Sequence, residues 1–199
     1  MERHRDRAER MEHILDAAER LLRERGLAHM TVLDVAGTLR LSHAAVYRYF
    51  PDKAALREAV AERWLQRISR PLAIIAERDG PAEERLREWA RALARLKRHK
   101  VIDDPEMFAA YSTLTASAGR VASAHIADLQ HQLARILADG RAQGTFHVND
   151  IARAAAAVQH ATLRFHHPQL LLPPNAPPTP HELDSVLDLL ISGLKAGAI

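Results

Sequence analysis

A short stretch of the chain carries side chains that suit contact with a nucleic-acid backbone. Tyr47 and Tyr49 each hold a hydroxyl on a rigid ring, and Lys53 falls at the expected start of a helix. There the lysine ammonium adds to the positive end of the helix dipole, which favours phosphate oxygens. Just upstream, Ala44 and Ala45 are small enough for close approach, and an alanine methyl can touch a thymine methyl. The pattern indicates binding to double-stranded DNA.

Three neighbouring residues extend this pattern. His43 is the side chain of the turn best able to hydrogen-bond a base edge, and Ser42 can cap the helix that starts there. Phe50 has no polar group and is expected to act as an apolar plug between helices. Aromatic residues at helical spacing also occur in ordinary cores, so the residue types alone leave a purely structural interpretation open.

The elements that must position these residues are short helices. Apolar residues recur at three- and four-residue spacing over 7–25, which predicts an amphipathic helix that ends at Gly26. Thr31 can cap a second helix that runs to about residue 39, and a third is expected over 43–50. Two short helices joined by a tight turn after a longer one predict a helix-turn-helix, whose second helix enters the major groove.

The rest of the chain is also expected to be helical, so the predicted fold class is all-α. A fourth helix starts near Asp52, and Pro71 is expected to bend or end it. Further helices are expected at about 82–98, 105–117, 119–143, 150–167 and 181–196. Six of the ten prolines fall between Pro168 and Pro180, in a loop that is either a linker or an ordered cover over neighbouring helices.

The segment Ile14–Leu56, ILDAAERLLRERGLAHMTVLDVAGTLRLSHAAVYRYFPDKAAL, resembles the DNA-binding domain of TetR/AcrR-type transcriptional regulators. The shared positions are Ala17, Ala18, Leu21, Gly26, Thr31, Val32, Ala36, Ser42, Tyr47, Phe50 and Lys53. The resemblance implies that Thr31, Tyr47, Tyr49 and Lys53 contact phosphates, while Ser42, His43, Ala44 and Ala45 face bases. It also implies an N-terminal three-helix DNA-binding domain at residues 1–52 and a C-terminal helical ligand-binding and dimerisation domain at residues 53–199.

One position departs from the family pattern. The family usually has glycine in the turn before the recognition helix, where a left-handed backbone is wanted, whereas this chain has Arg40 there and Gly37 inside the second helix. A non-glycine residue in that conformation costs about 1–2 kcal/mol. Three readings stay open: the turn has another geometry, Arg40 offsets the strain by reaching a phosphate, or the protein tolerates it.

The N-terminus is rich in arginine. Arg3, Arg5, Arg7 and Arg10 precede the first helix or open it, which is typical of a basic arm that reaches the minor groove. The alternative is a frayed, solvated terminus, because acidic residues alternate with the arginines and dilute the charge.

The last two expected helices carry wide apolar stripes, which favours self-association. The resemblance implies the same, since the family dimerises through its final helices. The expected interface residues are Ile151, Ala155, Val158, Thr162, Leu183, Val186, Leu187, Leu190, Ile191 and Leu194. An intramolecular core stripe explains part of this pattern. A two-fold dimer would present two recognition helices to a palindromic site.

The middle helices of the family usually enclose a ligand pocket. Apolar and aromatic residues with a few hydroxyls would suit a small, mostly apolar effector. The candidates are Trp89, Leu93, Phe108, Tyr111, Thr115, His125, Leu129 and Phe165. Core packing explains each of them equally well.

Composition limits the remaining function classes. The chain has no cysteine and no phosphate-binding glycine loop or Gly-x-Ser-x-Gly motif, so an enzyme and a cofactor are not expected. Its 12 histidines include no His-x-x-x-His pair, which argues against a metal site, although they could make affinities sensitive to mildly acidic pH. A net charge of +3 neither proves nor excludes a DNA partner. No apolar run would span a membrane, and a cytoplasmic location is expected.

These observations together predict a regulator that binds a palindromic operator as a homodimer. The main expectation is a repressor that a small apolar effector releases from DNA. A DNA-binding regulator without an effector and a metal-responsive regulator are the alternatives.

Overall fold

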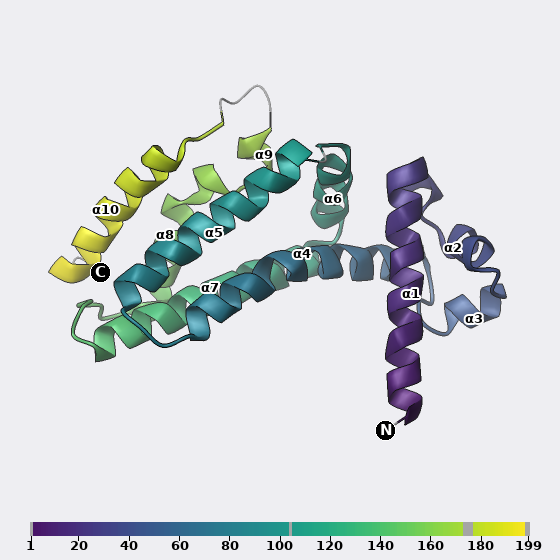
Figure 1. Cartoon of the computed structure of the whole chain (residues 1–199), viewed down its shortest axis with the longest axis horizontal. Coiled ribbons are helices and arrows are strands. Elements are labelled where there is room, and N and C mark those ends of the chain that lie inside the picture. Colours follow the sequence, from purple (N-terminus) through teal and green to yellow (C-terminus); the bar gives the residue numbers. More distant parts are fainter. Residues whose placement is uncertain (1, 104, 173–176, 198–199) are drawn as a thin grey trace. The chain divides into compact units, whose positions relative to one another are not determined.

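The computed structural model describes residues 2–103, 105–172 and 177–197, and every regular element among them is a helix (Figure 1). The all-α prediction is therefore confirmed. The chain forms two compact units. We call residues 1–65 with 104–123 the N-terminal unit, and residues 66–103 with 124–199 the C-terminal unit. The domain boundary expected after residue 52 stays a prediction.

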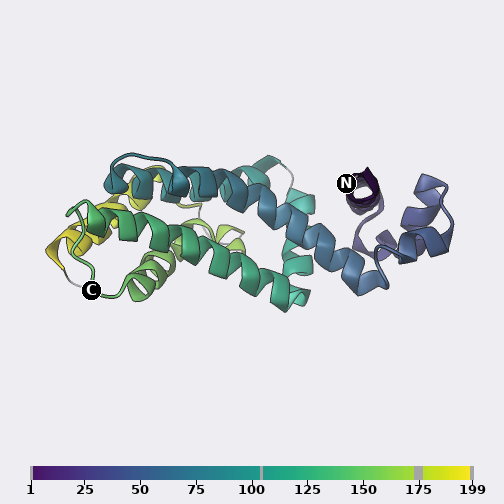
Figure 2. The same ribbon diagram turned by 90° about the horizontal axis from the view of Figure 1, so that it is seen from below.

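The N-terminal unit contains the three helices expected from the sequence. Its elements are α1 (Glu2–Arg25), the 3-10 turn η1 (Leu27–His29), α2 (Val32–Leu39), α3 (His43–Tyr47), the first half of α4 (Lys53–Glu77), α6 (Pro105–Ser117) and the start of α7 (Gly119–Ala142). Figure 2 shows α1 end-on beside the short α2 and α3. The core of this unit is buried apolar side chains from each helix, among them Ile14, Leu21, Val35, Val46 and Phe50. Phe50 is therefore the apolar plug that its residue type predicts.

The C-terminal unit is built from longer helices. Its elements are the second half of α4, α5 (Ala82–Asp103), most of α7, α8 (Ile151–Ala161), the 3-10 turn η2 (Leu163–Phe165), the short α9 (Pro168–Leu171) and α10 (Pro180–Ala196). Arg85 is buried and ties three of them together. Its guanidinium donates to the carbonyls of Ala76 (3.0 Å) and Arg78 (2.9 Å) and to the carboxylate of Asp139 (2.8 Å).

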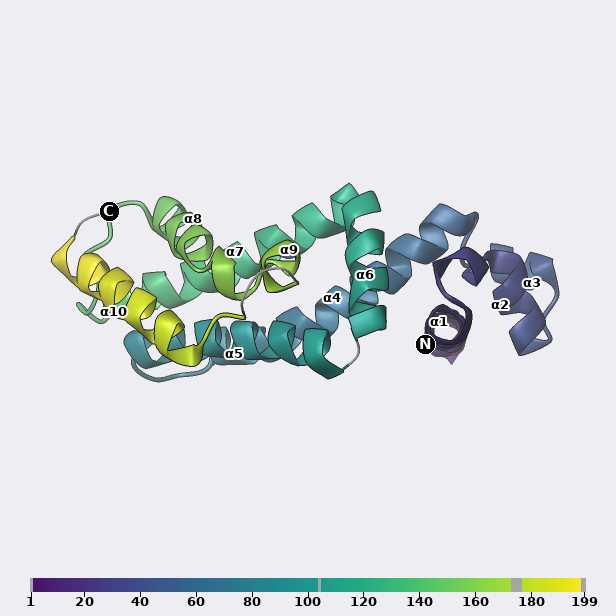
Figure 3. The ribbon, with the colours of Figure 1, turned by 90° about the horizontal axis from the view of Figure 1, so that it is seen from above.

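Helix α10 packs against α5 in antiparallel register (Figure 3). Three ion pairs set this register: Lys195–Glu83 at 2.6 Å, Arg87–Asp188 at 2.7 Å and Arg91–Asp184 at 2.7 Å. The apolar side chains that are buried beneath them are Leu183, Leu187, Ile191 and Leu194. Because exposed ion pairs contribute little, burial of this stripe supplies most of the stabilisation and the charges select the register.

Two expectations for single helices were wrong at their ends. Helix α1 begins at Glu2, so the N-terminal arginines lie on a regular helix rather than before it; the side chains of residues 2–4 lie outside the described part. The exposed Arg5 forms an ion pair with Glu9 across one turn (3.3 Å). Of the two outcomes expected at Pro71, an end of the helix is wrong, because α4 continues to Glu77; a bend there stays a prediction. Burial of Leu72 and Ala76 offsets the hydrogen bond that proline cannot donate.

The single helix expected over 150–167 is broken. Asp150 caps its start by accepting from the backbone N–H of Arg153 (3.0 Å). Near its end the buried hydroxyl of Thr162 donates to the carbonyls of Val158 (2.9 Å) and Gln159 (3.2 Å). Such bonding competes with the helical ladder and helps the chain to leave it. The short α9 then lies within the proline-rich loop, of which residues 173–176 fall outside the described residues.

Candidate nucleic-acid interface

Local hydrogen bonds place α2 and α3 where a helix-turn-helix needs them. The hydroxyl of Thr31 accepts from the backbone N–H of Asp34 (3.1 Å) and begins α2. The hydroxyl of Ser42 accepts from the N–H of Ala45 (3.2 Å) and begins α3. Both caps satisfy N–H groups that a helix leaves open at its start. Val46 is buried on the inner side of α3, so the opposite side of this helix is presented outward.

The turn between α2 and α3 passes through Arg40 in the left-handed region, with φ 54° and ψ 36°. Among the described residues it is the only one other than glycine with positive φ. Its N–H donates to the carbonyls of Ala36 and Gly37, and the N–H of Leu41 also donates to Ala36 (2.9 Å). This paired closure is typical of helices that end on a left-handed residue. The side chain of Arg40 is exposed.

The first turn of α3 offers small, exposed side chains. Ser42, His43 and Ala44 are exposed and Ala45 is half-buried, so this surface has no bulk that would keep a duplex away. A helix with a flat N-terminal turn can bring its backbone close to base edges. Only His43 projects a ring with hydrogen-bonding nitrogens from this turn. The structure thus brings together the four residues expected to face bases.

The expected phosphate contacts flank that turn. Tyr47 at the end of α3 is 44% exposed, Tyr49 is half-buried, and Lys53 is the exposed first residue of α4. Asp52 caps α4 by accepting from the N–H of Ala55 (2.7 Å). Arg48, which sequence reasoning did not include, is exposed between the two tyrosines. Arg48 could have been predicted from its charge, because an arginine between two candidate phosphate contacts is itself suited to contact a phosphate.

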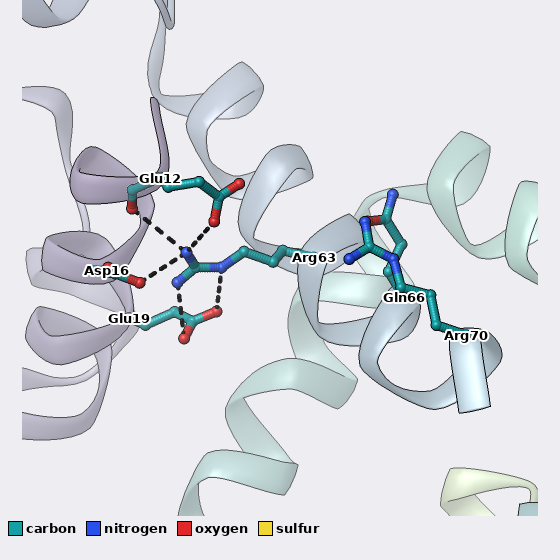
Figure 4. Close-up of polar contacts among 6 residues, drawn as sticks. All are labelled: Glu12, Asp16, Glu19, Arg63, Gln66 and Arg70. Atoms are coloured by element: carbon teal, nitrogen blue, oxygen red, sulfur yellow. Dashed lines mark hydrogen bonds and ion pairs between the residues drawn. The ribbon is translucent and has the colours of Figure 1, made fainter. Parts of the chain in front are cut away.

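Helix α1 is tied to α4 by a cluster that the sequence did not reveal (Figure 4). The Arg63 side chain is only 11% exposed and donates to the carboxylates of Glu12 (3.1 Å), Asp16 (2.8 Å) and Glu19 (2.9 Å). Burial lowers the pKa of this guanidinium, but the three carboxylates outweigh it and raise the pKa further above its usual range. The cluster could have been predicted from the spacing of the carboxylates. They are four and three residues apart on α1, which places them on one helix face.

The residues proposed for a ligand pocket are divided between the two units. In the N-terminal unit, Phe108 and Tyr111 of α6 are buried against Trp64 of α4. The Tyr111 ring stacks on Trp64 with centroids 4.6 Å apart, and Phe108 meets its edge at 6.2 Å. Thr115 is half-buried and returns its hydroxyl to the carbonyl of Tyr111 (3.0 Å). These contacts anchor α6 to α4.

In the C-terminal unit, Trp89 is buried and its indole N–H donates to Gln132 (2.9 Å). Leu93 and Leu129 are buried as well. Phe165 lines a groove of about 420 Å³ beside α5.

His125, the last residue of the set, is half-buried and interacts electrostatically with two buried basic residues of the same unit, Lys97 and His166. Burial, followed by the charges of Lys97 and His166, lowers the pKa of His125 to about 3. Burial and Lys97 likewise lower the pKa of His166 to about 4. Both rings are therefore neutral at mildly acidic pH in the folded protein. A change of ligand or dimer affinity at mildly acidic pH is therefore not expected from the charge of these two rings.

The residues proposed for a dimer interface lie on two sides of α8 and α10. Those buried within the chain itself are Ala155, Val158, Thr162, Leu183, Leu187, Ile191 and Leu194. Ile151, Val186 and Leu190 are half-buried, and Leu189, which was not in the proposed set, is 77% exposed. The outward stripe of α10 is thus Val186, Leu189 and Leu190, at the three- and four-residue spacing of one helix face.

Two other kinds of site are absent from the described residues. None of their helices is both long and apolar enough to cross a membrane. No three histidine or carboxylate side chains within that part of the chain converge as metal ligands would.

Comparison with known proteins agrees with this geometry. A family model described as bacterial regulatory proteins, tetR family, matches residues 14–60, and one described as tetracyclin repressor-like, C-terminal domain, matches residues 82–187. Two uncharacterized HTH-type transcriptional regulators from Mycobacterium tuberculosis strains CDC 1551 and H37Rv are each 34% identical over 103 residues, 51% of this chain and 48% of theirs. The chain spans about half the length of these curated relatives.

Solved structures share the fold over nearly the whole chain. A transcriptional regulator of the TetR/AcrR family from Thermobifida fusca superposes with a TM-score of 0.66 at 19% identity, over 93% of this chain and 98% of that one. RolR in complex with resorcinol superposes with a TM-score of 0.60 at 20% identity, over 98% and 93%. One family model covers the helix-turn-helix and the other more than half of the chain, so this protein belongs to the TetR family of bacterial regulatory proteins.

Proposed function

We propose that this protein is a transcriptional regulator that binds a specific duplex DNA site through α3. The observation that carries this proposal is the first turn of α3, where Ser42, His43 and Ala44 are exposed beside the exposed Tyr47 and Lys53. The cluster around Arg63 fixes α1 to α4, and α1 in turn contacts α2, which contacts α3. Small residues that approach bases, beside hydroxyl and ammonium groups that reach phosphates, are the arrangement that groove recognition requires.

Fluorescence anisotropy tests DNA binding directly. The full chain is titrated into duplex DNA from upstream of its own gene and into a scrambled duplex at physiological salt. We expect the specific duplex to bind at least roughly a thousandfold more tightly. Ala44→Glu should abolish this preference, because it places a carboxylate against the bases. The matched control is Ala116→Glu, at an exposed alanine of α6. Equal affinity of wild type for both duplexes from every upstream region tested would contradict the proposal.

Substitution of Lys53 tests whether this residue contacts a phosphate or a base. Lys53→Ala should weaken binding to specific and scrambled DNA by similar factors and reduce the slope of log affinity against log salt by about 1. Loss of affinity for the specific duplex alone would assign Lys53 to base reading instead.

We further propose that the regulator acts as a two-fold dimer through α8 and α10. The outward stripe of Val186, Leu189 and Leu190 supports this, because an exposed leucine beside half-buried apolar neighbours favours a partner surface. Leu189→Glu should shift sedimentation at micromolar concentration towards monomer. Ile74→Glu, at another exposed apolar residue, is the control. A wild-type protein that sediments only as monomer would rule out the dimer.

Finally, we propose that a small molecule releases the regulator from its operator. It is supported by the groove beside α5 and by a structural neighbour, RolR, that carries resorcinol. Binding of an effector would lower operator affinity if the effector prefers the conformation that does not fit DNA. A regulator without an effector is the second candidate, and it is favoured if no compound that binds the protein changes its operator affinity.

A further inference from the structure

The groove beside α5 combines an apolar lining with a row of cations. It lies within the C-terminal unit between α5, the η2–α9 segment and the start of α10. Its apolar side chains include Phe165, Leu171 and Leu183, and α5 contributes Arg91, Arg95 and Arg98. Its volume of about 420 Å³ is near the lower end of the ~300–1,000 Å³ typical of small-molecule sites. The space suits a compact molecule rather than a protein segment.

The three arginines differ in how many hydrogen-bond or ion-pair partners they have. Arg91 pairs with Asp184 (2.7 Å), and Arg98 donates to the carbonyl of Pro178 at 3.5 Å, the limit of a hydrogen bond. The exposed Arg95 makes no hydrogen bond or ion pair with any residue in the described ranges. Arginines three and four residues apart repel one another on a helix face. A bound anion would relieve this repulsion and use the free guanidinium of Arg95.

We propose that this groove binds a small amphipathic carboxylic acid, whose carboxylate is held by Arg95 and Arg98 while its carbon body lies against Phe165, Leu171 and Leu183. A guanidinium binds a carboxylate through two parallel N–H···O bonds, which adds direction as well as charge. A purely apolar molecule would leave the cations without a counter-charge, and a small inorganic anion would not use the apolar side. Both halves of the groove are satisfied by one amphipathic acid.

This assignment changes the chemical class of the expected effector. The sequence suggested a mostly apolar molecule, and of the residues then proposed only Phe165 lines the groove. The effector role of the acid rests on the proposed function, whereas its binding does not. The groove connects α5 with the start of α10, so an acid that bridges them would change how firmly α10 is held.

Calorimetric titration of the full chain without DNA tests the site. The probes are octanoate and benzoate, their uncharged counterparts 1-octanol and benzyl alcohol, and acetate, which has the charge without the body. We expect at least one of the two larger acids to bind ten times or more tightly than its alcohol and than acetate. Arg95→Gln should weaken acid binding about tenfold or more and leave alcohol binding unchanged. Arg95→Lys should be intermediate, because it keeps the charge but loses the fork.

The control is Arg153→Gln, at an exposed arginine of α8 outside the groove, which should bind acids as wild type does. Acids that bind no better than the alcohols, or an equal loss in Arg153→Gln, would overturn the inference. Operator anisotropy with the same proteins keeps the two proposals apart. Arg95-dependent acid binding in a protein without operator preference supports the site and contradicts the proposed function. Specific operator binding without acid binding supports the proposed function and contradicts the site.

Discussion

At the scale of single residues, Arg40 is held in a backbone conformation that disfavours it. Its φ of 54° lies in the left-handed region, where a side chain costs about 1–2 kcal/mol relative to glycine. Arg40→Gly should therefore raise the free energy of unfolding by about 1 kcal/mol, measured by urea denaturation. If operator affinity is unchanged in this variant, Arg40 makes no phosphate contact. A loss of affinity together with the gain in stability would show that the strain is kept for DNA binding.

Arg63 is the residue on which the attachment of α1 to α4 depends most. Arg63→Met should lower the free energy of unfolding by about 2–4 kcal/mol, because Glu19, which is itself largely buried, loses its cation. In the double variant with Glu19→Gln the loss should be smaller than the sum of the single losses. Strict additivity in this double-mutant cycle would show that the two groups do not interact.

At the scale of elements, the end of α7 depends on a glycine that has no room for a side chain. A Cβ on Gly140 would lie 2.1 Å from the ring of Phe146 and 3.0 Å from Ala82. Gly140→Ala should therefore destabilise the protein by about 1–3 kcal/mol through overpacking. Gly37 of α2 has no atom within 4 Å of the same position, so Gly37→Ala should stabilise it by about 1 kcal/mol. Thermal unfolding measures both variants. If their unfolding temperatures shifted in the same direction relative to wild type, the packing argument would be contradicted.

At the scale of the whole molecule, the buried His166 and the half-buried His125 couple stability to pH. Burial lowers the pKa of His166 to about 4 and of His125 to about 3, from about 6.5 when unfolded. Below pH 6.5 the unfolded chain binds more protons than the folded one, so the free energy of unfolding falls as the pH drops from about 6.5 towards 4. Each histidine should contribute about 2 kcal/mol of this loss between pH 7 and pH 5.

Urea denaturation of His166→Gln at these two pH values checks this coupling. The difference in unfolding free energy between pH 7 and pH 5 should shrink by about 2 kcal/mol, whatever the variant does to stability at pH 7. His181→Gln, at an exposed histidine of α10, should keep the wild-type difference. An unchanged difference in His166→Gln would show that this ring is protonated at pH 5 in the folded protein as it is in the unfolded chain.

The features that could be predicted from the sequence are those set by near neighbours in the chain. The caps at Thr31 and Ser42 depend on hydrogen bonds that span three residues, and the end of α1 depends on the freedom of Gly26. Predictions failed where burial overrode a local rule, as where α4 continues through Pro71 instead of ending there, and where the helix expected to run to residue 167 ends at Ala161. The candidate ligand residues could not be sorted, because an apolar side chain looks the same in a core and in a pocket.

The sequence by itself determined the helical fold, the helix-turn-helix and the residues that its turn presents, since amphipathic periodicity and capping act within a few residues. Only the tertiary structure decided which side of each helix remains available. It placed the strongest apolar stripe of α10 against α5 and left Leu189 outside, and it gathered Arg95 and Phe165 around one groove. The physical reason is that burial and charge pairing depend on side chains brought together from distant parts of the chain, as Arg63 is with Glu12, Asp16 and Glu19.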